Sequence, residues 1–149
     1  MIIDIKNATT RKQKRRLSNI AHFLAEHMIP AKTRDKLFLT ITILNDLGGD
    51  DVDGFTDLLH YDKDEIEIHV EVLRDLNEDE IVRTLAHEMV HVKQYACHQL
   101  VDAPSHHMKW KGELFPYDEN APWELEAYSL EHKLMDMINH YEQEIKTTN

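Results

Sequence analysis

A five-residue stretch with the pattern His-Glu-x-x-His constrains the fold of this chain most. It begins at His87 and ends at His91, with Glu88 second. In an α-helix, residues four apart lie on the same face, so both imidazoles can reach one metal ion. Glu88 would lie about 100° around the helix, where its carboxylate can reach a water beside the metal. The stretch therefore predicts a helix that carries a zinc site.

The residues around this stretch favour a helix with two distinct faces. Asn77 followed by Glu80 is typical of a helix N-terminus, and we expect the helix to run to about Leu100. The two histidines lie outside the apolar stripe of this helix, so the stripe can be buried while the imidazoles face a cleft. The stripe is formed by Ile81, Leu85, Met89, Val92 and Ala96.

Alternating apolar residues predict a small β-sheet. Residues 37–44 are apolar on both faces in places, which indicates a central strand, and residues 65–72 alternate cleanly between apolar and polar. Residues 2–5 and 55–61 can add two short strands, and the glycines and aspartates of 48–54 predict a polar loop.

Two further helices complete the predicted fold. Helical periodicity indicates a helix from about Thr10 to about Met28, ended by Pro30, and a last helix from Pro122 to about Lys146. Residues 101–121 are predicted to form a long irregular loop, and loops of that size in compact domains are usually functional. We therefore expect one α+β domain over residues 1–149.

Composition limits the classes of partner. The net charge of −11 argues against general nucleic-acid binding, although the first 36 residues are basic. A nucleic-acid contact could use one cluster on the first helix, and the alternative is a solvated helix face. This cluster contains Arg11, Lys12, Lys14, Arg15 and Arg16.

Neither a disulfide nor a membrane span is expected. Cys97 is the single cysteine, and no apolar run is long enough to cross a membrane. The N-terminus becomes charged too soon for a signal peptide. These features predict a soluble cytoplasmic protein; they leave its oligomeric state open.

The third metal ligand is not fixed by spacing. A catalytic zinc takes three protein ligands and one open position. Glu124 is favoured because it lies in the first turn of the last helix and can project toward the site. The alternatives are Glu126, which points about 160° away from Glu124, and the pair His106 and His107. Glu131 could accept a hydrogen bond from a ligand imidazole, and the alternative is a plain surface carboxylate.

The combination of His-Glu-x-x-His, the segment Trp110-Lys111-Gly112 and the later Pro-Trp-Glu-x-Glu-Ala-Tyr resembles the small gluzincin-type zinc peptidases of bacteria and phages. This resemblance implies a zincin-like α+β fold, with a mostly antiparallel sheet of three or four strands on the three helices. It implies one zinc per chain held by His87, His91 and Glu124, with Glu88 as general base in the hydrolysis of peptide bonds. Its rim strand, residues 55–60, would pair with an extended peptide or protein substrate.

A second resemblance is to the SprT-like proteins, which take a loop histidine as third ligand. His106 or His107 before Trp110 is similar to that arrangement, but the expected His-Gly pair and zinc-ribbon cysteines are absent from the sequence. It implies a DNA-associated protease, and a further alternative is a zincin-fold binding or regulatory protein without activity.

The group that stabilises the oxyanion is not identified; the candidates are Tyr117, Tyr128, His98, His106 and His107.

Overall fold

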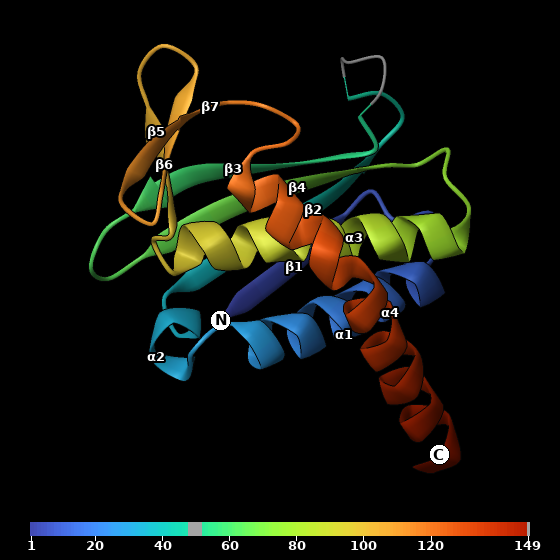
Figure 1. Cartoon of the computed structure of the whole chain (residues 1–149). Helices are drawn as coiled ribbons and strands as arrows, with labels where there is room; N and C mark the ends of the chain where they lie inside the picture. The colour runs from blue at the N-terminus through green and yellow to red at the C-terminus, as the bar shows by residue number, and fades with distance from the viewer. Residues whose placement is uncertain (48–51, 149) are drawn as a thin grey trace.

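A four-stranded sheet forms the centre of the computed structural model, which describes residues 1–47 and 52–148 (Figure 1). The strand order is β1 (Ile2–Lys6), β2 (Leu37–Leu44), β4 (Ile66–Leu73) and β3 (Gly54–Tyr61). β2 pairs in parallel with β1 and β4, whereas β3 runs antiparallel to β4. The predicted α+β class is confirmed, and the sheet is mixed. Residues 48–51, part of the predicted polar loop, lie outside the described residues.

The alternating strands bury one face of this sheet. In the register of β2 and β4, Leu39 lies beside Ile68 and Ile41 beside Val70, and all four side chains are buried. Residues two apart in a strand share a face, so this face is continuous and apolar. β2 lies between two other strands, as its sequence predicts, and β3 forms one edge of the sheet.

Two long helices pack against the sheet, and a third packs on these two. α1 (Arg11–Met28) and α3 (Glu78–Ala96) lie next to each other, and α4 (Pro122–Thr148) crosses them before its C-terminal end extends beyond the body (Figure 1). The short α2 (Ala31–Arg34) was not predicted. None of the described helices has the length and apolar character needed to span a bilayer.

α3 begins as the sequence predicts, because the side chain of Asn77 accepts a hydrogen bond from the backbone N–H of Glu80. The helix ends at Ala96, earlier than expected. His98 has a left-handed backbone conformation (φ 59°), which turns the chain toward the next strand.

The prediction of an irregular loop over residues 101–121 is wrong for most of its length. The chain forms a second, antiparallel sheet of β5 (Leu100–Ala103), β6 (His107–Trp110) and β7 (Glu113–Pro116). Lys111 and Gly112 both have positive φ and form the two-residue turn between β6 and β7. The buried side chains of Met108 and Trp110 join this sheet to the core.

One member of the basic cluster on α1 is occupied by ion pairs. The guanidinium of Arg16 pairs with Glu142 on α4 and with Glu78 at the start of α3. Arg16 therefore joins three helices. Nucleic-acid binding by the remaining four exposed residues of the cluster stays a prediction.

Candidate metal centre

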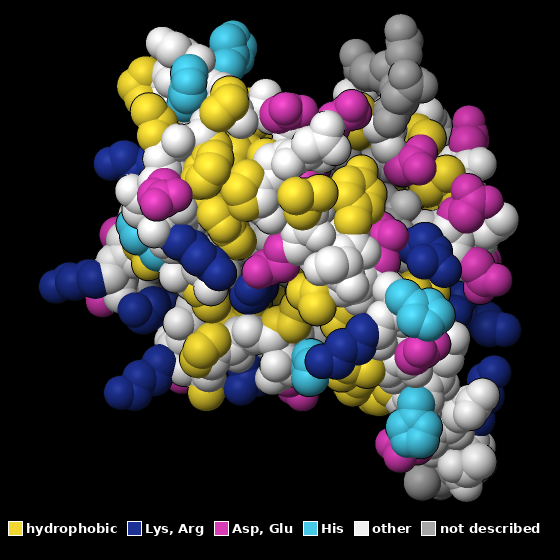
Figure 2. Space-filling view, in the orientation of Figure 1, with side chains coloured by type: hydrophobic (Ala, Val, Ile, Leu, Met, Phe, Trp, Pro, Cys, Tyr) yellow, Lys and Arg dark blue, Asp and Glu magenta, His cyan; other side chains and the backbone are white. Residues whose placement is uncertain are grey.

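α3 presents the two histidines to a cleft of about 610 Å³. The cleft lies between α3, strand β3 and the first turns of α4, with Tyr117 also on its wall. Hydrophobic side chains gather around the start of α4 in the view of Figure 2. The residues of the apolar stripe of α3 are all buried and the two histidines line the cleft, so both faces of the helix lie as its sequence predicts.

Glu124 meets the two histidines at this cleft. Its Oε1 lies 2.5 Å from Nε2 of His91 and 3.3 Å from Nε2 of His87. One donor atom from each of these residues lies within 4.8 Å of the others, and no other cluster of this kind occurs among the described residues. Two imidazole nitrogens and one carboxylate oxygen form a donor set that zinc prefers, so these residues fit the ion.

The other ring nitrogen of each histidine also has a partner. Nδ1 of His87 lies 3.1 Å from Glu131, and Nδ1 of His91 lies 2.8 Å from Oε1 of Gln94. An amide oxygen or a carboxylate can only accept, so both Nδ1 atoms carry the proton. Both Nε2 atoms face Glu124, and in the neutral imidazoles their lone pairs would be the ones available to a metal ion. Of the two alternatives for Glu131, the structure supports the hydrogen bond with an imidazole, that of His87.

Gln94 is fully buried, and its hydrogen bonds fix its orientation. Its Nε2 donates to the backbone carbonyl of Trp123 (3.0 Å) and to Oε1 of Glu126 (3.1 Å). The amide therefore presents its oxygen to His91. Its position three residues after His91, on the same helix face, is the sequence signal that could have identified it.

The alternative third ligands lie elsewhere. Glu126 pairs with Nζ of Lys93 at 2.8 Å, in addition to its contact with Gln94. His106 and His107 lie at the turn between β5 and β6, where Nδ1 of His107 donates to the carbonyl of Ser105. Neither Glu126 nor these histidines belong to the donor cluster.

Contacts within the donor cluster shift the pKa values of the two histidines and Glu124. Burial would lower the pKa of both histidines, but hydrogen bonds with Glu124 and the nearby carboxylates outweigh it and raise the pKa of each. Burial opposes ionisation of Glu124, but the same hydrogen bonds lower its pKa to about 2. Glu124 is therefore a carboxylate at neutral pH.

Glu88 lies beside the cluster and outside it. Its side chain is buried, with Oε1 2.9 Å from the hydroxyl of Thr56 on β3. Burial raises the pKa of Glu88, and this effect outweighs the opposing influence of His91 and His87. Sequence reasoning missed Thr56, because nothing in the chain marks which strand residue faces Glu88.

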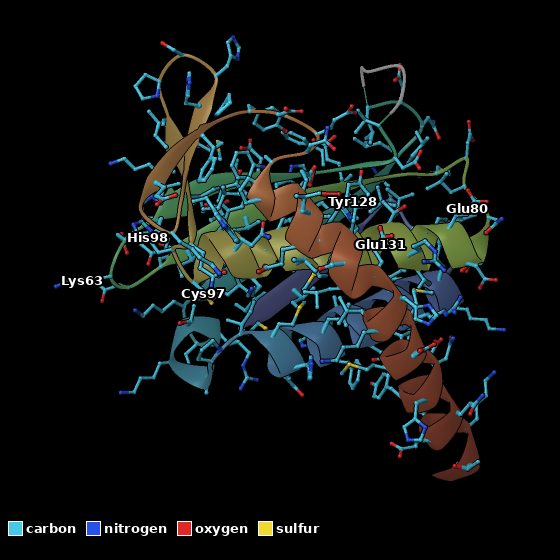
Figure 3. The ribbon with its side chains drawn as sticks, viewed as in Figure 1. Lys63, Glu80, Cys97, His98, Tyr128 and Glu131 are labelled. Atoms are coloured by element: carbon cyan, nitrogen blue, oxygen red, sulfur yellow. The ribbon has the colours of Figure 1, made fainter. Side chains whose placement is uncertain are left out.

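Two of the predicted oxyanion candidates lie at the cleft. Tyr117 and Tyr128 are on its wall, and the Tyr128 ring lies 4.7 Å from that of His87. Figure 3 places Tyr128 and Glu131 on α4 where it crosses α3, and His98 away from them at the C-terminal end of α3. His98 instead stacks on Tyr61.

The sequence model of the SprT-like family matches residues 19–114. The chain belongs to the SprT-like family. This family consists of zinc metalloprotease-like domains. No curated protein and no solved structure matches the chain.

The family match bears on the two resemblances seen in the sequence. It supports the SprT-like one, and the specific gluzincin features are not confirmed. The matched segment of this SprT-like chain contains His87, Glu88 and His91, and it ends within β7. Glu124 lies beyond it, so the third donor of the cluster comes from outside the family segment.

Proposed function

We propose that this SprT-like chain is a zinc-dependent peptidase that hydrolyses peptide bonds, with one zinc per chain. His87, His91 and Glu124 would hold the metal, and Glu88 would act as general base. The observation that carries this proposal is the convergence of three donor atoms within 4.8 Å at a cleft that also contains the buried Glu88 carboxylate.

The proton transfers of the hydrolysis can be assigned to a residue of the chain. When bound, zinc supplies Lewis acidity that polarises a carbonyl and makes water more acidic. Glu88 takes the proton of the attacking water and later delivers it to the leaving amine. Its raised pKa suits both roles, because a group that titrates nearer to neutral pH gives and takes protons more readily.

Two other groups support the same reaction. The hydroxyls of Tyr117 and Tyr128 are available to donate to the developing oxyanion, since the pKa of each is raised by burial and by neighbouring carboxylates. Strand β3 forms the sheet edge next to the cleft, and its outer backbone groups can pair with an extended peptide or protein.

The test combines metal analysis with cleavage of a fluorescently labelled unfolded protein. We expect about one zinc per chain and cleavage that a chelator abolishes. Glu88→Gln should keep its zinc and lose at least about 100-fold in rate. Glu80→Gln is a matched control, because Glu80 is exposed on the same helix and Gln also serves in its capping arrangement.

Other results would change the conclusion. Equal rates for Glu88→Gln and wild type would remove Glu88 from the mechanism. Bound zinc without cleavage would favour a binding or regulatory zincin-fold protein. Cleavage that requires added DNA would favour a DNA-associated protease.

A further inference from the structure

The carboxylate of Glu88 is contacted from strand β3 as well as from its own helix. Thr56 is buried on β3, and its hydroxyl lies 2.9 Å from Oε1 of Glu88 and 3.3 Å from the Glu88 backbone carbonyl. The hydroxyl donates and the carboxylate oxygen accepts. This hydrogen bond fixes one oxygen of the carboxylate relative to the sheet.

Gly54 provides the space that the other half of the carboxylate occupies. A Cβ atom at position 54 would lie 3.0 Å from Cγ of Glu88, 3.1 Å from its Oε2 and 2.7 Å from Cγ2 of Thr84. Gly54 does not have a positive φ, so glycine is needed here for close approach and not for backbone conformation. β3 thus limits both the position and the rotation of the Glu88 side chain.

The two β3 residues act together because they share a strand face. Gly54 and Thr56 are two residues apart, and they pair with Val72 and Val70 of β4. Both valines are buried in the core, so this part of β3 is firmly anchored. A general base must stay within hydrogen-bond reach of the proton that it removes, and small displacements reduce the rate strongly.

We propose that Thr56 is a positioning residue for Glu88, with Gly54 leaving the room that this position requires. The edge strand next to the cleft would then both border the substrate and orient the base. This inference rests on the proposed peptidase function, but the position of the Glu88 side chain can be tested separately.

The test compares Thr56→Val, Thr56→Ser and wild type. Thr42→Val is a matched control, because Thr42 is a buried threonine of β2, which β4 separates from β3, and its hydroxyl lies 2.9 Å from Nε2 of His69. We expect Thr56→Val to keep its zinc and its KM, and to lose roughly 10- to 100-fold in kcat, part of what a general base contributes. Thr56→Ser should return kcat to near the wild-type value, and Thr42→Val should not change it.

Crystal structures of the same zinc-loaded variants give a readout that does not depend on activity. We expect the Glu88 carboxylate to leave its place beside β3 in Thr56→Val and to keep it in Thr56→Ser. An unmoved carboxylate with wild-type kcat in Thr56→Val would overturn the proposal, as would a loss of kcat that serine does not restore. If the wild type cleaves nothing, the proposed function fails, and the position of Glu88 in these structures still decides the role of Thr56.

Discussion

Gln94 joins His91 to the first turn of α4. Its amide oxygen lies 2.8 Å from Nδ1 of His91, and its amide nitrogen lies 3.0 Å from the carbonyl oxygen of Trp123, the residue before Glu124. One buried side chain therefore sets the orientation of one proposed ligand and the position of the helix turn that carries another. This contact is one of those that hold α3 and α4 together at the site.

Replacing Gln94 should weaken zinc binding although Gln94 is not a ligand. Gln94→Leu has a similar volume, but it leaves Nδ1 of His91 and the Trp123 carbonyl without their partner. We expect zinc affinity to fall by roughly 10- to 100-fold, the usual cost of losing a partner of a ligand imidazole. Competition with a chromogenic chelator measures this. Gln143→Leu, at an exposed position of α4, is the control. Equal zinc affinities of Gln94→Leu and wild type would show that Gln94 does not orient His91.

The third ligand can be identified by metal content. Glu124→Ala should lose the zinc, because it removes the only carboxylate of the donor cluster. Glu126→Ala and His107→Ala should each keep about one zinc, because Glu126 pairs with Lys93 and His107 bonds to Ser105. Elemental analysis of the four proteins, wild type included, distinguishes these cases. Zinc lost in His107→Ala and kept in Glu124→Ala would assign the third ligand to the loop histidine.

Protein treated with a chelator should be most stable at mildly acidic pH. The folded-state pKa values of His87 and His91 are raised from 6.5. Their contribution to the free energy of unfolding is therefore complete below pH 6.5 and is lost as the pH rises through the raised values. The pKa of Glu124 is lowered from 4.5 to about 2, so its contribution is present above pH 4.5 and is lost as the pH falls toward 2. The free energy of unfolding should therefore be largest between about pH 4.5 and 6.5.

Zinc should reverse this dependence above pH 6.5. The metal competes with the imidazole protons, so its affinity rises with pH and it stabilises the folded state most where the histidines are neutral. Urea unfolding from pH 4 to 8.5, with and without zinc, measures both curves. Stability that rises steadily from pH 5 to 8 in the chelated protein would contradict the expectation.

Adding one methyl group at position 54 should disturb Glu88. The new Cβ in Gly54→Ala would lie 2.7 Å from Cγ2 of Thr84 and 3.0 Å from Cγ of Glu88, so these side chains must move. We expect a loss of about 1–3 kcal/mol in the free energy of unfolding, typical of overpacking, together with slower cleavage. Gly112→Ala is the contrast, because position 112 has open space but a φ of +89°. Gly112→Ala should lose stability through backbone strain and keep its cleavage rate. Equal cleavage rates for Gly54→Ala and Gly112→Ala would argue against a close fit at Gly54.

Patterns of neighbouring residues in the sequence predicted those helices and strands that bury a regularly spaced set of apolar side chains. The N-cap at Asn77 and the alternation in β2 and β4 act within a few residues, so the sequence shows them directly. The second sheet was missed because its strands are only four residues long and its turns place Ser105, His106 and Lys111, which are not glycines, at positive φ. Parallel pairing was also missed, since the period of two is the same for both strand directions.

The same limit applies to the site. The positions of His87 and His91 follow from one helix, and this was predicted. The choice among Glu124, Glu126 and the loop histidines depends on how α4 crosses α3, which no local pattern encodes. Thr56 and Gln94 were missed for a related reason, because Thr56 on β3 contacts Glu88 on α3, and Gln94 on α3 contacts Trp123 on α4.

The arrangement of donors has a consequence for how the chain is held together. Two donors lie on α3 and the third at the start of α4, with the whole β5–β7 sheet between them in sequence. A metal bound there would close this segment as a loop, in the manner of a covalent cross-link that a chelator can open. Metal occupancy would then report on the assembly of the C-terminal part of the chain, because the complete donor set exists only where α4 has docked.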